Sequence, residues 1–412
     1  MRNPKFPALM LGTDVLTAET SLAGGAVRSA QNITMTDDGA FARRPSAVLA
    51  TPYSGLHSLW ASPAGALYAA AGTDLLRIDA TTGSISVLWS GLPYDERVSF
   101  CDVNGATYIA APGVLRKIYP AGTVCVPGIR DLLGDRPTLT ATTGSLTPGT
   151  YGVGYTLVTA AGEESAMSSV SWLALSTTGG IHASMLAYTS EVVAHRLYVT
   201  PPNGERMYFN TEVPLGQAFD ITDGTLKQDG ELRRHRSPLP GGRIVRYYRG
   251  RLYVAYGSTV YVSDPYCEFY DIYGGWLQFD HEVTLLEPVL SGIYVGTTKE
   301  VVFLDGPEPG SFKLAVVAPR GAYAGTGCHL PADWLDGRLA NDRAHPPAAW
   351  LSDVGMVVGL PDGNVHAPQA ERIRMTSAGG SVATLVQNGL RQVLFPLESM
   401  AIGVGGAVDT TL

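Results

Sequence analysis

The chain has 412 residues, with 29 Lys or Arg against 37 Asp or Glu, so its formal net charge is −8. Apolar residues make up 45% of the chain, Gly (48) and Pro (27) are frequent, and only 16% of residues are charged, against roughly 25% in typical soluble domains. This composition excludes coiled coils, helical bundles and disordered tails, and the acidic balance argues against a protein that grips nucleic-acid phosphates with clustered Lys and Arg.

The N-terminal segment does not predict a targeting signal. It starts with basic residues, but its apolar run is short and is interrupted by Pro7 and Asp14, so we expect no secretory signal. No window approaches 18 uninterrupted apolar residues, and we therefore expect a protein made in a cytoplasm without a membrane-spanning segment.

A repeat with a period of about 40 residues runs through most of the chain. Each copy joins two short runs of β-branched and aromatic residues through a Gly-containing turn, a pattern that predicts a β-hairpin. Four clear copies span residues 65–79, 105–118, 250–264 and 292–305, and a weaker one spans 355–366. A hairpin alone is marginal in water, and the period matches one four-stranded propeller blade. We therefore predict an all-β fold, a β-propeller of five or six blades.

Both ends of the chain predict further hairpins. Residues 32–44 indicate a strand, an Asp-Gly turn and a second strand, and residues 382–395 indicate a hairpin around Asn388-Gly389. Pairing of the two ends would close the ring, so we expect the first blade to be built from both termini.

The period fails once, because 145 residues separate Gly105 from Gly250. Short strands at about ten-residue spacing in this interval, with turn signals between them, predict a sandwich of fibronectin-III type inserted between blades. The predicted domains are N-terminal blades at 1–136, the inserted β-sandwich at 137–232, and C-terminal blades with ring closure at 233–412.

A search for catalytic carboxylates finds one cluster. A glycoside-hydrolysing propeller needs two carboxylates that converge on its funnel, and Asp264, Glu268 and Asp271 are the best candidates. Asp commonly bonds to the backbone where a strand gives way to a turn. We therefore interpret this cluster as structural and expect no enzyme and no catalytic residue.

The sequence also predicts no metal site and no cofactor. Its eight histidines form no H-E-x-x-H or H-x-H group, and no phosphate-binding or nucleophile-elbow motif is present. The cysteines lie far apart without a C-x-x-C pair, which indicates small core residues. They are Cys101, Cys125, Cys267 and Cys328.

Aromatic residues are concentrated in the segment 247–276. Alternating Tyr in strands is typical of a propeller core, while Tyr and Trp also supply rigid contact area at protein–protein interfaces, and both interpretations stay open. The candidate interface residues are Tyr247, Tyr248, Tyr256, Tyr266, Tyr270, Tyr273 and Trp276.

Two features together resemble a known family. The opening segment Gln31–Ser46 is followed by blades of the form Gly-x-Leu-Tyr-x-Ala-x-Gly and Val-Tyr-x-Ser-Asp, with a sandwich inserted at 137–232. This combination resembles the tail-hub proteins of short-tailed bacteriophages, also called nozzle or packaged-DNA stabilisation proteins. The resemblance covers most of the chain and rests on repeat style and architecture, and no catalytic residue carries over from it.

The resemblance implies a homohexameric ring, assembled in the host cytoplasm, that forms the distal channel of the virion tail beneath the portal adaptor. It would retain the packaged genome, guide DNA ejection and dock tail fibres, spikes or a needle. An acidic channel wall would let double-stranded DNA pass without sequence-specific binding. Two alternatives stay open: a carbohydrate-binding or carbohydrate-cleaving propeller that acts as a receptor-binding component, and a cellular adhesion module.

Overall fold

The structure is a computed structural model of the chain. It describes residues 12–28, 33–35, 41–43, 53–129, 132, 134–160, 162, 164–185, 192–223, 227–231, 236–266, 268–334, 345–387, 390–399, 401–404 and 407–409. Within these ranges the only helices are three short 3-10 turns, η1 (Glu19–Ser21), η2 (Pro309–Ser311) and η3 (Ala332–Trp334). None of the helices in the described ranges has the length and apolar character needed to cross a bilayer.

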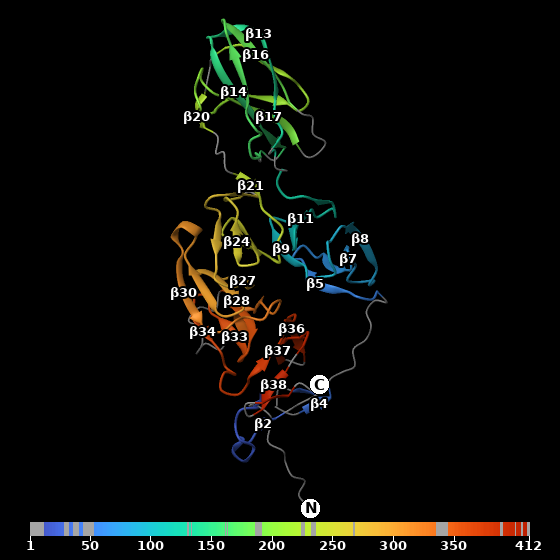
Figure 1. The fold of residues 1–412 in the computed structure, drawn as a ribbon. Coiled ribbons are helices and arrows are strands. Elements are labelled where there is room, and N and C mark those ends of the chain that lie inside the picture. Colours follow the sequence, from blue (N-terminus) through green and yellow to red (C-terminus); the bar gives the residue numbers. More distant parts are fainter. Residues whose placement is uncertain are drawn as a thin grey trace, which may run out of the picture.

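Among the described residues, five four-stranded antiparallel sheets form the blades of a propeller (Figure 1). Blade 1 contains β5 (His57–Ala61), β6 (Leu67–Ala71), β7 (Asp74–Ile78) and β8 (Ile85–Ser90). Blade 2 contains β9 (Ser99–Val103), β10 (Ala106–Ala111), β11 (Val114–Ile118) and β12 (Val124–Cys125). Blade 3 contains β22 (Ile244–Tyr248), β23 (Arg251–Tyr256), β24 (Thr259–Val262) and β26 (Trp276–Gln278). Blade 4 contains β27 (Val283–Pro288), β28 (Gly292–Thr297), β29 (Val301–Asp305) and β30 (Lys313–Ala318), and blade 5 contains β31 (Cys328–His329), β32 (Ala348–Ser352), β33 (Gly355–Gly359) and β34 (Val365–His366).

The tyrosine of each clear repeat packs its blade against the next one. Tyr68, Tyr108, Tyr253 and Tyr294 lie on the second strands of blades 1 to 4 and are at most 5% exposed. Each belongs to an apolar cluster that includes residues of the following blade, as Tyr294 does with Trp350. The tyrosine recurs in the repeat because it makes the contact between neighbouring blades. A lone four-stranded sheet would leave these rings in water.

The weak fifth repeat lies one strand later in its blade than the other copies. Residues 355–366 form β33 and β34, the third and fourth strands of blade 5. The second strand is β32, where Trp350 is fully buried. The hairpin is confirmed, but its predicted alignment with the clear copies is wrong, because the Gly–Tyr signature is absent from β32.

Two further sheets form a sandwich inserted between blades 2 and 3. One contains β13 (Thr138–Leu146), β16 (Gly179–Ser184) and β19 (Phe219–Ile221); the other contains β15 (Ser171–Leu175), β14 (Gly149–Thr159), β17 (Val192–Val199), β18 (Tyr208–Pro214) and β20 (Lys227–Glu231). Their facing residues share one core that includes Val153, Ile181 and Leu197. The chain crosses repeatedly between the sheets, as in immunoglobulin-like modules. The predicted fold class, an all-β propeller with an inserted sandwich of fibronectin-III type, is thereby confirmed.

The sandwich lies beyond blades 2 and 3, on one side of the propeller, at the top of the view in Figure 1. A short antiparallel ladder between β21 (Arg236–Pro238), which follows the sandwich, and β25 (Phe269–Asp271), which lies within the blade 3 segment, connects the two domains. The ring of Phe269, 1% exposed, packs in a cluster with Ile129, Leu132 and Tyr155. Residues next to the blades and residues of the sandwich therefore share a small core at the junction.

The two predicted terminal hairpins form, but they do not pair with each other. The first contains β3 (Ile33–Met35) and β4 (Phe41–Arg43), and the second contains β36 (Ala383–Gln387) and β37 (Leu390–Leu394). In the described ranges they belong to separate two-stranded sheets. The expectation that the first blade is built from both termini is therefore wrong. The remaining terminal strands are β1 (Gly12–Thr13), β2 (Ala26–Val27), β35 (Met375–Thr376), β38 (Ala401–Val404) and β39 (Ala407–Asp409).

The C-terminal segment instead links blade 5 to the connector between blades 1 and 2. Val393 of β37 packs on the core of blade 5. Arg97, which precedes blade 2, donates a 2.7 Å hydrogen bond to Glu398 Oε1. At the N-terminus, the Val15 amide donates to the carbonyl of Arg372 at 2.9 Å. Contacts between loops, and not a shared sheet, therefore connect the C-terminal segment after blade 5 to the first blades and to the N-terminal segment.

Candidate functional site

The aromatic segment of blade 3 divides into a buried part and an exposed part. Tyr256, Tyr266, Tyr273 and Trp276 are 50%, 81%, 69% and 41% exposed. Tyr247 and Tyr270 are half-buried against the blade 2–blade 3 core. Ile272, which the pattern of aromatic residues does not single out, is 41% exposed within the same group.

Tyr248 is a predicted interface residue that the structure instead places in the core. It is 6% exposed, and its hydroxyl donates to the carbonyl of Gly306 at 3.0 Å within the core between blades 3 and 4. A side chain in this position cannot contribute to a surface. It occupies the last position of β22, on the same face of the strand as Ile244, and both residues pack against blade 4.

The three candidate acids contact different partners. Asp264 Oδ2 lies 2.9 Å from Nε of Arg236 on β21. Asp271 Oδ1 accepts a 2.9 Å hydrogen bond from the amide of Tyr273, in the turn after β25. Glu268 belongs to the buried network described next. Each carboxylate therefore holds local structure, which agrees with the structural interpretation of the cluster.

Glu268 joins blade 2 to the base of the sandwich. Its side chain is 5% exposed, and Oε1 accepts a 2.8 Å hydrogen bond from Nζ of Lys117 on β11. The hydroxyl of Tyr108 donates to the same oxygen, and the amide of Gly128 donates to Oε2. The backbone carbonyl of Glu268 accepts from the amide of Leu239 at 3.0 Å. One residue therefore contacts both connectors of the inserted sandwich, before it at Gly128 and after it at Leu239.

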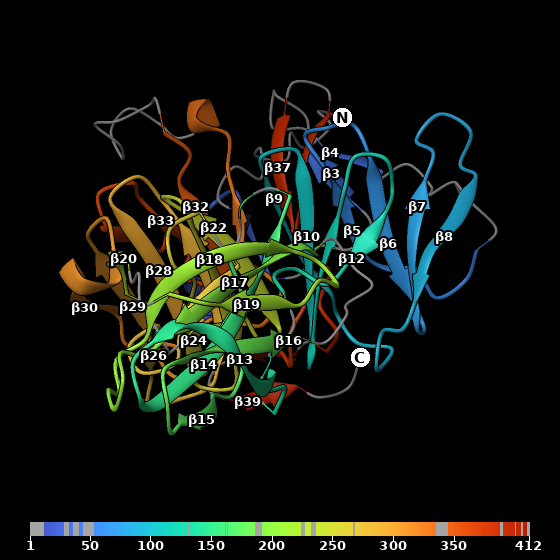
Figure 2. The same ribbon diagram turned by 90° about the horizontal axis from the view of Figure 1, so that it is seen from above.

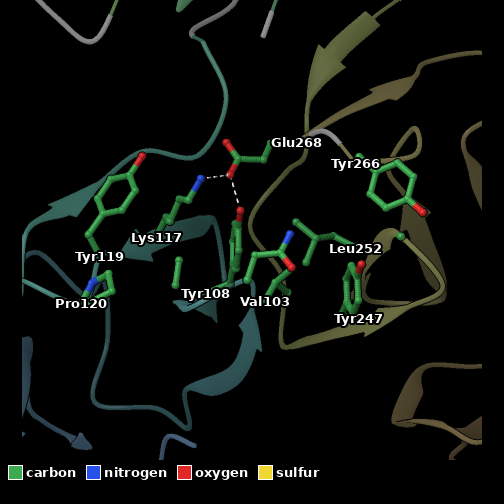
Figure 3. A pocket seen from close by; sticks show the side chains of 12 residues that line it. Val103, Tyr108, Lys117, Tyr119, Pro120, Tyr247, Leu252, Tyr266 and Glu268 are labelled. Carbon is green, nitrogen blue, oxygen red and sulfur yellow. Dashed lines mark hydrogen bonds and ion pairs between the residues drawn. The ribbon is translucent and has the colours of Figure 1, made fainter. Parts of the chain in front are cut away.

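A pocket of about 230 Å³ opens beside this network (Figure 3). We call it the interblade pocket, because its walls come from blades 2 and 3. Lys117, Glu268 and Tyr108 lie between two groups of aromatic rings, with Tyr119 on one side and Tyr247 and Tyr266 on the other. The remaining lining residues are Val103, Asn104, Ala106, Pro120, Gly250 and Leu252.

Tyr266 lines the pocket and has a strained backbone conformation. Its φ is +57°, a left-handed conformation that is an outlier for a bulky residue. Its amide donates to the carbonyl of Gly250 at 2.7 Å, and its ring lies so close to Gly250 that a Cβ there would approach it to 3.1 Å. Gly250 itself has a φ of +83°, so this turn requires glycine for two reasons.

A second polar network runs across the first strands of successive blades. Arg246 of β22 donates from Nη1 to Ser99 Oγ of β9 at 3.0 Å and from Nη2 to Glu287 Oε1 of β27 at 2.7 Å. His329 Nδ1 of β31 lies 3.5 Å from the other carboxylate oxygen of Glu287. Burial alone would lower the pKa of Arg246, but the adjacent Glu287 carboxylate outweighs it and holds that pKa above its ordinary value. The network links four consecutive blades.

The cysteines and histidines form no metal site in the part of the chain that the structure describes. Cys101 and Cys328 are free thiols, the thiol of Cys125 donates to the carbonyl of Lys117 at 3.7 Å, and Cys267 lies outside the described residues. Burial raises the pKa of Cys101 and of Cys328 to about 12, so neither is an activated nucleophile.

Two outer strands expose apolar side chains. On β30, the edge strand of blade 4, Leu314 and Val316 are 63% and 57% exposed. On β8, the edge strand of blade 1, Val87 is 53% exposed. These strands lie on opposite sides of the propeller in both views (Figures 1 and 2). We call them the two outer edges.

Comparison with known proteins identifies no family. No family model matches the chain, and no curated protein matches its sequence. Among solved structures, AztD of Citrobacter koseri is 9% identical with a TM-score of 0.26, over 75% of this chain and 84% of that chain. A chain of the complex of BBS1N with ARL6DN is 12% identical with a TM-score of 0.25, over 72% and 75% of the two chains. Likenesses this weak carry no argument, so the fold assignment rests on the sheets themselves.

Proposed function

We propose that this chain is the ring-forming subunit of the tail hub, or nozzle, of a short-tailed bacteriophage. In this role it acts as a structural wall and not as an enzyme. It retains the packaged genome in the distal tail channel, guides DNA during ejection and docks fibres, spikes or a needle. Its partners are further copies of itself and the portal adaptor.

The observation that carries the proposal is the pair of outer edges. An exposed edge strand with apolar side chains is a template for pairing with another chain. Contact between β30 of one copy and β8 of the next would be a head-to-tail contact, and such contacts close into a ring when the rotation between copies is suitable. Because the two edges lie on opposite sides of one subunit, each copy could contact one neighbour on either side.

Two further features support the same role. The exposed aromatic residues Tyr256, Tyr266, Tyr273 and Trp276 supply anchors of the kind that dominate protein–protein contacts. The net charge of −8 disfavours tight binding of DNA phosphates. The contacts of Asp264, Glu268 and Asp271 within the fold favour this role over carbohydrate cleavage.

The proposal is tested by measuring the mass of the particles that the purified chain forms as its concentration is raised. We expect hexamers for the parent protein and a shift toward monomer in Leu314→Glu, which places a charge on the outer edge of blade 4. Val193→Glu is the matched control, because Val193 is 49% exposed on the sandwich. Equal assembly of Leu314→Glu and the parent would remove the outer edge of blade 4 from the interface.

A further inference from the structure

The interblade pocket combines apolar aromatic faces with buried polar atoms. Tyr119 faces it from blade 2, while Tyr247 and Tyr266 face it from blade 3 (Figure 3). Between them, Glu268 and Lys117 are 5% and 16% exposed. Small-molecule sites have this composition, with mostly apolar and aromatic walls and a few convergent polar groups.

Within the pocket, the positive charge of Lys117 is compensated by the negative charge of Glu268. Lys117 Nζ lies 5.2 Å from the ring centroid of Tyr119 and 5.5 Å from that of Tyr108, the position that a cationic ligand takes over aromatic rings. The same ammonium is 2.8 Å from the Glu268 carboxylate. A cationic ligand would have to displace Lys117, and an anionic ligand would meet Glu268. The site therefore favours a neutral ligand.

The strained backbone of Tyr266 is a second, independent indication of a ligand-binding site. Burial does not explain its left-handed backbone, because the side chain is 81% exposed. One face of the ring lies against Gly250, which leaves the other available beside the pocket. Strain of this kind is found at ligand-binding positions that the surrounding structure enforces.

We propose that the interblade pocket binds one neutral sugar ring of a larger glycan. A pyranose presents a face of C–H groups that can lie against the Tyr119, Tyr247 or Tyr266 rings. Its hydroxyls can donate to Glu268 and accept from Lys117 or from the amide of Asn104. The volume of about 230 Å³ lies below the roughly 300–1,000 Å³ of drug-sized sites, which suits a single ring. Binding goes beyond the proposed assembly role and does not depend on it, because one chain supplies every wall.

The test is saturation-transfer NMR on the whole 412-residue chain. The probes are the methyl glycosides of glucose, galactose, mannose, rhamnose and N-acetylglucosamine. We expect transfer to the ring protons of at least one probe, and binding about tenfold weaker or worse in Tyr119→Ala and in Tyr266→Gly, as for a truncated aromatic anchor. Glycine is chosen at position 266 because it adopts the left-handed backbone without strain. Tyr266→Phe keeps the ring face and is expected to bind.

Tyr273→Ala is the matched control, because Tyr273 is an exposed tyrosine of the same segment outside the pocket. It is expected to bind as the parent does. The absence of transfer to every probe, or transfer that survives both Tyr119→Ala and Tyr266→Gly, would overturn the proposal. Tetramethylammonium chloride is the competing probe. Its binding in the pocket would also overturn the proposal, because it would assign an aromatic cage for cations.

Discussion

The Lys117 ammonium and the Glu268 carboxylate form a 2.8 Å ion pair between β11 of blade 2 and the segment that leads into β25. The same carboxylate accepts from the amide of Gly128, where the chain leaves the propeller for the sandwich. The contact between two blades and the anchor of the inserted module are therefore one network, and its parts should respond together to substitution.

The first prediction concerns this network. Glu268→Gln removes the charge that compensates Lys117, whose side chain is 16% exposed. Breaking a buried pair by neutralising one partner is strongly destabilising, and we expect a loss of about 2 kcal/mol in the free energy of unfolding, measured in urea. Glu308→Gln is the control, because Glu308 is 61% exposed and 3.8 Å from Arg251. Equal effects of the two substitutions would contradict the prediction.

The second prediction concerns the network across the first strands. Arg246→Met leaves the Glu287 carboxylate, 2% exposed, without its 2.7 Å partner, and we expect a loss of about 3 kcal/mol at pH 7. A buried carboxylate that loses its compensating charge is costly, so this loss should far exceed the loss caused by breaking an exposed ion pair.

Urea unfolding of the parent and the variant at pH 7 measures this effect. Arg243→Met is the exposed control, because Arg243 is 52% exposed and pairs with Glu96 at 3.2 Å. It should cost less than about 1 kcal/mol. Equal losses in Arg246→Met and Arg243→Met would show that the buried Glu287 carboxylate is not the origin of the loss.

The third prediction concerns packing between blades 4 and 5. A Cβ at Gly359 would lie 2.6 Å from the ring of Tyr294 and 2.8 Å from that of Trp350, both fully buried. Gly359→Ala should therefore destabilise the protein by about 1–3 kcal/mol through overpacking. At Gly310 a Cβ would meet nothing within 4 Å, so Gly310→Ala should be close to neutral. Thermal unfolding of the two variants provides the comparison, and indistinguishable midpoints would argue against close packing at Gly359.

The fourth prediction concerns the thiols. Because burial raises the pKa of Cys101 and Cys328 to about 12, only about one thiol in ten thousand is ionised at pH 8, and the thiolate is the reactive form. Alkylation of the folded protein with iodoacetamide should be very slow at both positions and should rise about tenfold per pH unit up to pH 10. Peptide mass spectrometry after timed labelling resolves each cysteine. Rapid labelling of Cys101 at pH 8 would contradict its burial.

The sequence predicts the blades well where one residue type marks a contact between them. Tyr68, Tyr108, Tyr253 and Tyr294 recur because each fills the same space against the next blade. In blade 5 the buried ring is Trp350 on a strand without the Gly–Tyr signature, so the repeat signal shifts to the following hairpin. The terminal hairpins follow from local turn chemistry, whereas ring closure through Arg97 and Glu398 joins residues 301 apart and leaves no local pattern.

The candidate site was only partly predictable for a related reason. The concentration of Tyr in 247–276 indicates a special surface, but the sequence cannot separate buried Tyr248 from exposed Tyr266, because both occur in similar aromatic surroundings. Glu268 is one of the three candidate acids, but its partners Lys117 and Gly128 precede it by about 150 and 140 residues, so no local pattern predicts its contacts. The interblade pocket likewise exists only once blades 2 and 3 are side by side, across the inserted sandwich.

Cryo-electron microscopy of the purified chain at high concentration tests whether it assembles into rings. We expect closed six-fold rings in which β30 of each subunit lies against β8 of its neighbour, with a continuous central channel. Particles that remain monomers at every concentration, and do not form rings when the portal adaptor is added, would contradict this expectation.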